Sequence, residues 1–401
     1  MSDWKEYRLG DICEVFGRIG FRGYTSKDLV ETYEDGAISL SPSNIVQGEI
    51  ELSKCTYIKW DKYEESPEIK IQVGDIIFVK TGSSYGRSAL IRSVEHPMTL
   101  NPQLVVLKNI KVNPIILSYV IKGREFQGKV YGIIGGSAIP TLSQKRLAEL
   151  TIKLPSKERQ DRISDILLSI DSKISVNRRI CENLEAQAQA LFKHWFIDFA
   201  PFKDGKFVES ELGMIPEGWR VGTLGEIADI TMGQSPSGSS YNENGNGVVF
   251  YQGRAEFGYR FPKVRLFTTE PKRFAEPLST LLSVRAPVGD INVATEKCCI
   301  GRGLAAIKSK SYHSSYILYL LKSLRRRFDV YNGEGTVFGS INKDTLNGLN
   351  IVIPPNSAIR EFNDIVQVSD SEILESHNED IRLQALRDTL LPRLMSGEIK
   401  L

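Results

Sequence analysis

One stretch of the chain decides its architecture. Residues 157–199 read KERQDRISDILLSIDSKISVNRRICENLEAQAQALFKHWFIDF and contain neither glycine nor proline. Apolar residues recur in this stretch at alternating spacings of four and three, which is typical of a helix that packs along another helix. The stripe consists of Ile163, Leu167, Ile170, Ile174, Asn177, Cys181, Leu184, Ala188, Leu191 and Trp195. The pattern predicts one long helix within residues 156–199.

A second stretch has the same character. Residues 357–395 contain no glycine, and their one proline is Pro392. The same spacing links Phe362, Val366, Ser369, Ile373, Ser376, Asp380 and Leu383, and after a phase change it continues through Leu386, Leu390 and Leu394. Two such stripes in one chain can bury each other. The sequence therefore predicts an intramolecular coiled coil whose second helix lies within residues 356–401, each helix being about 60 Å long at ~1.5 Å per residue.

The predicted seam has a polar middle. Asn177 lies in the first helix, and Ser376 and Asp380 lie in the second. One interpretation is a solvated gap. The other is that Asn177 sets the register and pairing of the helices, a known use of a buried polar residue in coiled coils. On the second interpretation, Asn177→Leu is expected to raise thermal stability and to permit wrong pairing.

The chain also contains an internal repeat with a period near 200 residues. The segment from Trp4 to Ile12 returns as the segment from Trp219 to Ile227, and Tyr119–Lys122 returns as Tyr319–Lys322. Further landmarks keep their order, because Leu104–Lys108 returns as Leu304–Lys308, and Gly136, Leu147 and Pro155 return as Gly335, Leu346 and Pro354. A period of this length indicates duplicated domains.

Each copy opens with a globule that differs in composition from the helices. Residues 1–155 and 200–355 are rich in glycine, proline, aromatic and β-branched residues. Short apolar runs bounded by turn residues predict strands, and longer amphipathic runs predict short helices. The predicted strands include Asp75–Val79, Leu104–Leu107 and Thr280–Val284, and the predicted helices include Ile115–Lys122 and Tyr316–Arg327. The expected fold class is α+β, with two mixed globules (1–155 and 200–355) and two long helices (156–199 and 356–401).

Charge is unevenly distributed along the chain. The 401 residues include 51 Lys and Arg and 49 Asp and Glu, a net charge of +2 that excludes a polybasic binder. The two globules carry net charges of +2 and +4, whereas residues 356–395 carry −4. Any contact with nucleic acid therefore belongs to the globules, and the acidic second helix is better suited to protein partners.

Several chemistries lack the residues they need. Five cysteines and four histidines form no CxxC pair or ligand ladder, so we expect no metal site and no disulfide framework. The chain has no P-loop and no amino-methyltransferase signature, and we expect no catalytic residue. The first residues lack the apolar core of a signal peptide, and no apolar run approaches the ~20 residues of a membrane span. A cytoplasmic location is expected.

Glycine-rich loops in the globules hold the residues best suited to contact nucleic acid. Glycine permits close backbone approach, arginine can fork onto guanine, glutamine onto adenine, and lysine contacts phosphate. We expect loops in equivalent positions of the two globules to supply these residues. The candidates are Lys80, Ser83, Ser84, Tyr85 and Arg87 in the first globule and Gln252, Arg254 and Arg285 in the second. Arg325–Arg327 fits a phosphate contact or a solvated helix end better than a base contact.

This organisation resembles that of the specificity (S) subunit of Type I restriction–modification systems. The resemblance covers essentially the whole chain. Its landmarks are Trp4 with Leu9-Gly10-Asp11-Ile12, Trp219 with Leu224-Gly225-Glu226-Ile227, the stretches Gly136–Leu147 and Gly335–Leu346 that leave the globules, and the helix entries at Pro155 and Pro354-Pro355. One departure is that Glu158 and Gln160 align with Ser357 and Ile359, so the Glu-x-Gln pattern occurs in the first copy alone.

The resemblance implies a non-catalytic DNA-recognition subunit. Each globule would recognise one half of a bipartite, asymmetric double-stranded DNA target, and the antiparallel helices would set the spacer between the halves. Two methyltransferase (M) subunits would dock on this chain, and restriction/translocase (R) subunits would join them. S-adenosylmethionine would be bound by the M subunits for adenine methylation, with no cofactor on this chain.

Three other interpretations stay open from the sequence. The chain could serve a related system in which one partner carries both methylation and cleavage. It could be a stand-alone enzyme acting on nucleic acid through an unrecognised site. It could also be a scaffold that does not bind DNA, which a steep loss of DNA affinity with salt would exclude.

Overall fold

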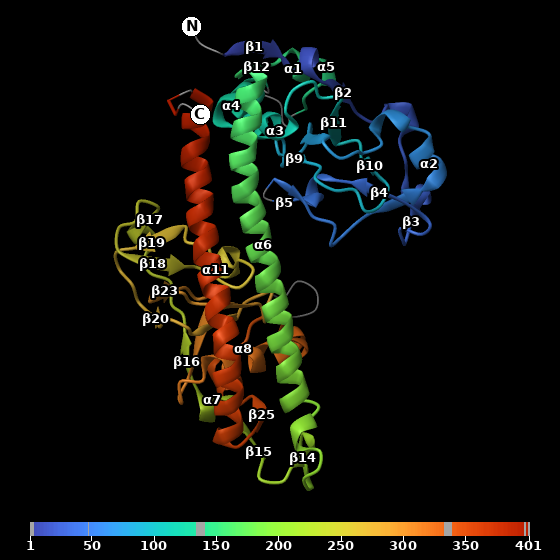
Figure 1. Ribbon diagram of the computed structural model, residues 1–401. Coiled ribbons are helices and arrows are strands. Elements are labelled where there is room, and N and C mark those ends of the chain that lie inside the picture. The colour runs from blue at the N-terminus through green and yellow to red at the C-terminus, as the bar shows by residue number, and fades with distance from the viewer. Residues whose placement is uncertain (1–3, 47, 134–140, 333–338, 397, 400–401) are drawn as a thin grey trace. The chain divides into compact units, whose positions relative to one another are not determined.

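The computed structural model describes residues 4–46, 48–133, 141–332, 339–396 and 398–399 (Figure 1). The chain divides into two compact units. Unit 1 comprises Met1–Lys173 and Leu383–Leu401, and unit 2 comprises Ile174–Arg382. Within the described ranges, no helix is long and apolar enough to cross a membrane. The finer division at residues 155, 199 and 355 stays a prediction.

Both long helices are present. Helix α6 spans Lys157–Phe196 and helix α11 spans Asn356–Ser396. In unit 1 Arg159 of α6 bonds to the carbonyl of Ile399, just beyond α11, and Asp171 bonds to Arg387 of α11. In unit 2 Asn177 bonds to Asp380, and the ring of Phe192 lies 5.6 Å from that of Phe362. Within each unit the contacting position falls as the position on α6 rises, so the helices run antiparallel. The predicted fold class is confirmed.

The buried face of each helix follows most of the predicted stripe. Ile163, Leu167 and Ile170 are buried in unit 1, whereas Ile174, Leu184, Leu191 and Trp195 are half-buried in unit 2. On α11, Phe362, Val366, Ile373 and Leu394 are buried and Leu383 and Leu390 are half-buried. Two details differ from the prediction. Leu386 is 48% exposed, and Glu185, Phe192 and Phe196, which are not in the predicted stripe of α6, are buried in unit 2 together with the predicted Cys181 and Ala188.

The polar middle of the seam is a hydrogen-bonded cluster and not a solvated gap. Asn177 is 1% exposed. Its side-chain Nδ2 donates to Glu379 Oε2 at 2.7 Å and to Asp380 Oδ1 at 2.8 Å. Hydrogen bonds to charged acceptors are stronger than neutral ones, so this amide couples one position of α6 to one turn of α11.

The contacts of Asn177 predict that Asn177→Leu lowers stability, which is the opposite of the gain expected from the sequence. A leucine would remove both amide donors and place an apolar side chain against two carboxylates, which is expected to lower the free energy of unfolding by about 1–3 kcal/mol. Chemical denaturation measures this change. Val176→Leu, one residue away and 49% exposed, is the control that should leave stability near that of the wild type. A leucine variant as stable as the wild type would contradict the structural role of the amide.

Unit 1 forms a mixed α+β globule. Its principal sheet has the order β2-β11-β8-β9 and a second sheet has the order β10-β4-β7-β3, while β1 pairs with β12 and β5 with β6. The strands are β1 (Lys5–Arg8), β2 (Glu14–Phe16), β3 (Leu29–Val30), β4 (Gly36–Leu40), β5 (Ile45–Val46), β6 (Glu49–Ile50), β7 (Tyr57–Lys59), β8 (Ile76–Val79), β9 (Ser88–Leu90), β10 (Met98–Leu100), β11 (Leu104–Lys108) and β12 (Thr151–Leu154). The helices are α1 (Leu9–Ile12), α2 (Trp60–Glu64), α3 (Pro114–Lys122), α4 (Arg124–Gly132) and α5 (Gln144–Glu149), with 3-10 turns η1 (Gly20–Arg22), η2 (Ser26–Asp28), η3 (Pro42–Asn44) and η4 (Pro67–Ile69).

Unit 2 contains a globule of the same type. Its sheets have the orders β16-β24-β21-β22 and β17-β19-β18-β23-β20, while β15 pairs with β25 and β13 with β14. The strands are β13 (Phe207–Ser210), β14 (Gly213–Pro216), β15 (Arg220–Thr223), β16 (Ala228–Met232), β17 (Tyr241–Asn242), β18 (Val248–Tyr251), β19 (Leu266–Thr268), β20 (Phe274–Ala275), β21 (Thr280–Ser283), β22 (Ile291–Val293), β23 (Cys298–Ile300), β24 (Leu304–Ser309) and β25 (Asn350–Ile353). The helices are α7 (Leu224–Ile227), α8 (Ser314–Ser323), α9 (Arg325–Asp329) and α10 (Lys343–Asn347), with turns η5 (Ala200–Phe202), η6 (Gly238–Ser240), η7 (Arg254–Glu256) and η8 (Val330–Asn332).

The two globules are copies in topology as well as in sequence. The sheet β2-β11-β8-β9 corresponds strand for strand to β16-β24-β21-β22, and the parallel pair β4 and β10 corresponds to β18 and β23. The helix predicted over Tyr316–Arg327 is two helices, α8 and α9, which meet at Leu324. Gly136–Pro140 and Gly335–Phe338, the beginnings of the predicted globule exits, lie outside the described residues.

The entry of each long helix is tied to its globule by a buried amide. Gln160 accepts a bond from the backbone N–H of Asn113, which caps α3, at 3.1 Å. In unit 2, Asn363 accepts one from the backbone N–H of Ser315 in α8 at 3.2 Å. Both amides are 4% exposed. The glutamine that the second copy lacks is therefore replaced by an asparagine lying one turn later in the helix.

A tyrosine and an aspartate join each globule to a long helix. Tyr119 of α3 donates to Asp171 of α6 at 2.7 Å, and Tyr319 of α8 donates to Asp370 of α11 at 3.0 Å. Both aspartates are mostly buried, with side-chain exposures of 14% and 16%. The duplicated Tyr–Asp pair places each globule on its helix by the same contact.

Candidate nucleic-acid interface

The loop between β8 and β9 in unit 1, residues 80–87, is held in place at its first two residues. The Leu142 N–H donates to the Lys80 carbonyl at 2.9 Å. Thr81 forms an antiparallel bridge with Thr141, and their hydroxyl oxygens lie 2.6 Å apart. We call residues 80–87 the first loop. Its start therefore has a defined place beside the segment that leads to α5.

Lys80 is a half-buried cation in this loop. Burial lowers the pKa of its amine below the usual value. In the part of the chain that the structure describes, no carboxylate is paired with this amine. A partly desolvated ammonium without an acidic partner gains from a bound anion, so Lys80 remains a candidate for phosphate contact.

Tyr85 belongs to the core and not to the surface. Its side chain is 4% exposed, and its hydroxyl donates to the Val130 carbonyl at 3.3 Å. A buried ring cannot stack on a base, so we remove Tyr85 from the candidate set. The glycines that flank it explain the misreading, because Gly82 and Gly86 have φ angles of +99° and +83° and turn the chain so that Tyr85 points inward.

The other residues of the first loop stay candidates. Ser83 and Arg87 are exposed, and Ser84 is half-buried. No described residue accepts a hydrogen bond from the Arg87 guanidinium. Gln127 of α4 donates from Nε2 to the Gly86 carbonyl at 2.9 Å, which holds the end of the loop next to Arg87. A supported backbone with free polar side chains suits contact with DNA.

The corresponding loop of unit 2, residues 284–290, carries Arg285. The Ile341 N–H donates to the Val284 carbonyl at 3.0 Å, and Arg285 bridges to Ser340 as Thr81 bridges to Thr141. We call residues 284–290 the second loop. Arg285 is exposed, and its guanidinium has no partner among the described residues. The equivalence expected from the sequence therefore holds for Arg285, at the position of Thr81.

Gln252 and Arg254 do not lie in the second loop. They follow β18, whose counterpart in unit 1 is β4, so the expected equivalence with the first loop is wrong for both. The duplicated strands are short and their loops differ in length, so sequence alignment misplaces the loops. Both side chains are nevertheless exposed.

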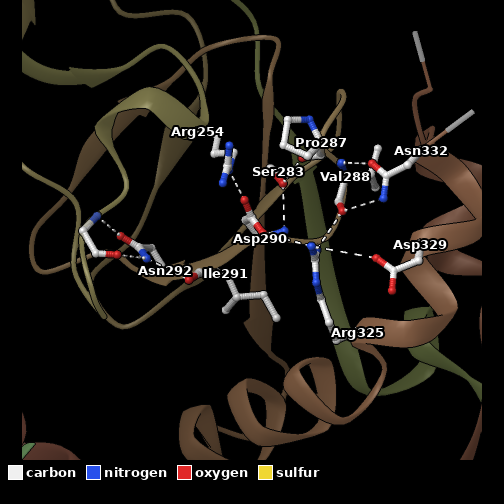
Figure 2. Close-up of polar contacts among 11 residues, drawn as sticks. Arg254, Ser283, Pro287, Val288, Asp290, Ile291, Asn292, Arg325, Asp329 and Asn332 are labelled. Carbon is white, nitrogen blue, oxygen red and sulfur yellow. Dashed lines mark hydrogen bonds and ion pairs between the residues drawn. The ribbon is translucent and has the colours of Figure 1, made fainter. Parts of the chain in front are cut away.

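Arg254 nevertheless contacts the second loop, because its side chain bonds to Asp290. Figure 2 shows Asp290 between Arg254 and Arg325. Arg254 bonds through Nε to Asp290 Oδ2, and Arg325 Nη2 lies 3.2 Å from Asp290 Oδ1. Arg325 also donates from Nη1 to the Val288 carbonyl at 2.7 Å. Two arginines that are far apart in the sequence thus meet on one carboxylate.

A side-chain amide of β22, the strand that directly follows the second loop, also bonds to the segment after β18. Asn292 Oδ1 accepts from the Gly258 N–H at 3.0 Å, and Asn292 Nδ2 donates to the Gly258 carbonyl at 3.1 Å (Figure 2). A pocket of about 300 Å³ lies here. It is lined by Arg254, Phe257, Gly258, Asp290, Ile291 and Asn292. The segment 252–258 and the second loop therefore form one continuous surface, which we call the Asp290 surface.

The two globules differ in charge at equivalent points of these loops. Arg87 in the first loop corresponds to Asp290 in the second, because each directly precedes the strand that pairs with β8 or with β21. Gln127 and Arg325 both donate to a backbone carbonyl of the loop. Similar frameworks therefore present different side chains, which is what recognition of two different sequences requires.

The Type I restriction modification DNA specificity domain family matches residues 1–186 and 216–389. These two matches cover most of the chain and coincide with the duplication. The chain belongs to this family.

Relatives along the whole length agree with the assignment. A type I restriction enzyme specificity subunit of Methanocaldococcus jannaschii is 32% identical and covers 100% of this chain and 94% of its own length. Another from Haemophilus influenzae is 23% identical, with both chains covered completely. The crystal structure of a type I S subunit from M. genitalium has a TM-score of 0.56, 17% identity, and coverage of 98% of this chain and 96% of that chain. It supports the fold.

Sequence reasoning missed several residues of this S subunit's candidate interface. Asp290 and Asn292 carried no signal, because a single acid or amide near a glycine is common in loops. Arg325 stands in a basic run whose sequence predicts a phosphate contact or a solvated helix end, whereas the structure shows that it supports the second loop. Among the described residues, no group of three or more His, Cys, Asp or Glu side chains is placed to hold a metal ion.

Proposed function

We propose that this S subunit recognises a bipartite, asymmetric double-stranded DNA target, one half with each globule. The observation that carries the proposal is the duplication of the framework with different side chains on it: Lys80 and Arg87 on the first loop, Arg285 and Asp290 on the second. Two globules that recognised the same half-site sequence would need identical loops. Two related frameworks with unlike loops fit two unlike half-sites.

The proposal assigns catalysis to partner subunits. Two M subunits would bind S-adenosylmethionine and methylate adenine, and R subunits would join them for translocation and cleavage, in the cytoplasm. Support comes from the acidic character of residues 356–395 and from exposed apolar side chains on α11, where Ile365 is 49% and Val368 is 69% exposed. An acidic surface with apolar residues suits a protein partner better than phosphate.

Single-loop variants test the division of labour between the globules. We expect Arg87→Ala to relax base preference in one half-site and Arg285→Ala to relax it in the other, each by about 1–3 kcal/mol at the affected base pair. Lys80→Ala is expected to weaken binding to all duplexes alike and to reduce the salt slope by about 1. The measurement is selection from random duplexes with the complex of S and M subunits, followed by affinity titration at several salt concentrations.

The wild-type complex supplies the baseline, and Lys203→Ala, a change at an exposed lysine that follows η5 and lies in neither loop, is the matched control. Changes by Arg87→Ala and Arg285→Ala in the same half-site would contradict one globule per half-site. Binding that does not depend on salt would contradict DNA recognition altogether.

A further inference from the structure

Asp290 is an acidic residue on a surface that we assign to DNA. A carboxylate there repels phosphate, so its presence demands a compensating role. The side chain is 25% exposed and lies between two arginines whose side chains are 55% and 42% exposed, Arg254 and Arg325. Its position suggests that it controls how one of these cations is presented.

The bond from Asp290 uses one edge of the Arg254 guanidinium and leaves the other free. Asp290 binds Nε of Arg254, and no described residue is bonded to the terminal nitrogens Nη1 and Nη2. Arginine has a planar fork of donors that matches N7 and O6 of guanine. The free donors of Arg254 are therefore the pair suited to a base edge.

Asp290 is itself rigidly supported. Its backbone N–H donates to Ser283 Oγ at 2.9 Å, and Arg325 holds its other carboxylate oxygen. The preceding residues are fixed as well, because the Val288 N–H donates to Asn332 Oδ1 at 2.6 Å (Figure 2). A side chain ordered before binding loses less conformational entropy when it meets its ligand.

We propose that Asp290 is a positioning residue that orients Arg254 toward a guanine in the half-site recognised by unit 2. This inference rests on the proposed function and names the base and the residue. Asp290 acts in two ways. It selects the orientation of Arg254. Its negative charge also repels the DNA phosphates, and this weakens binding to DNA in which no bond between Arg254 and a guanine offsets the repulsion.

The test compares Asp290→Asn with the wild type in the complex of S and M subunits. We expect discrimination of guanine from other bases at one position to fall on the order of tenfold, because a neutral amide holds a guanidinium weakly. We also expect affinity for duplexes without the target to rise several-fold at low salt, because one negative charge is removed. Loss of affinity for both kinds of duplex by a folded variant would overturn the proposal, because the proposal requires affinity for duplexes without the target to rise.

Two further variants isolate the role of Asp290. Asp329→Asn removes the same charge beside Arg325, which it contacts at 3.8 Å, and is expected to leave guanine discrimination intact. In an Arg254→Ala background, Asp290→Asn should produce no additional loss of discrimination, since the two residues act as one unit. Additive losses would overturn the positioning role. A wild-type complex that binds all duplexes equally would overturn the proposed function itself, whereas a selective wild type with an unchanged Asp290→Asn variant would overturn the role of Asp290 alone.

Discussion

Replacing Arg260 by methionine is expected to lower the free energy of unfolding of unit 2 by about 3–5 kcal/mol. Arg260 is 5% exposed and bonds to two carboxylates on different long helices, Glu185 of α6 and Asp370 of α11. It also donates to the Tyr319 hydroxyl at 2.9 Å. Removal of the guanidinium leaves Glu185 buried, with Lys322 as the one cation paired with it among the residues that the structure describes.

The large effect comes from the buried carboxylate that loses its cation and not from the strength of the ion pair itself. A buried ion pair contributes little net stability, because desolvation of both charges opposes their attraction. Deletion of one partner, however, strands the other charge in a place from which water is excluded. Methionine is chosen because it fills similar space without a polar group. Lys322→Met is the control, since the lysine is 24% exposed and Arg260 would still neutralise Glu185.

The effect of Arg260→Met should shrink as the pH falls. Burial acts to raise the pKa of Glu185, but the charges of Arg260 and Lys322 outweigh it, so the pKa lies below the usual value. A carboxyl with a depressed folded-state pKa stabilises the fold above its unfolded-state pKa, and this stabilisation disappears as the pH falls through the folded-state value. Wild type should therefore lose its advantage over the variant below about pH 4.

Hydrogen exchange is the appropriate measurement, because it separates unit 2 from unit 1. Protection should fall in α8 and in residues 356–382, while β8 and β11 of unit 1 keep their rates. An unchanged exchange profile at pH 7, or a difference between wild type and variant that grows in acid, would refute this account of the network.

The strands and long helices of the two copies could be predicted from the sequence because the same pattern of residues occurs twice. Trp4 and Trp219 mark the start of the same antiparallel pairing, β1 with β12 and β15 with β25, and both copies end in a helix without glycine. The arginines that tie the globules to the helices could not be predicted in this way. Arg92, whose Nη2 bonds to Asp171 of α6 at 2.7 Å, lies two residues after the end of β9. Arg260, by contrast, comes from the segment after η7 and reaches the end of β22, where its carbonyl accepts from the Val293 N–H at 2.9 Å.

The face of α6 shows a second limit of sequence reasoning. A heptad stripe assumes that the other helix is the only partner. In unit 2 the helix also packs on the globule, where the Phe192 and Phe196 rings lie 5.8 Å and 5.2 Å from that of Tyr316. The buried face therefore moves by one residue, from Leu191 and Trp195 to these two phenylalanines. Tertiary contacts decide which side of a helix is buried, and the helical period alone does not contain them.

Lengthening both long helices by four residues is expected to lengthen the DNA spacer that the subunit accepts by about two base pairs. The insertions belong after Lys173 in α6 and after Arg382 in α11, where the chain passes from one unit to the other. Four residues add about 6 Å along a helix, and a base pair adds about 3.4 Å along DNA. Matched insertions keep Asn177 opposite Asp380, so the hydrogen bonds of the seam are preserved.

The spacer prediction depends on both helices acting together. An insertion in α6 alone shifts Ile163, Leu167 and Ile170 relative to their partners on α11, and we expect it to destabilise the chain without defining a new spacer. Four residues placed after Gly245, in an exposed loop of unit 2, add the same length elsewhere and should leave the spacer unchanged. Selection from random duplexes reports half-sites and spacer in one experiment. New half-sites at the old spacer would contradict the role of the helices, because only the recognition loops should determine the bases, whereas the helices should determine the distance between them.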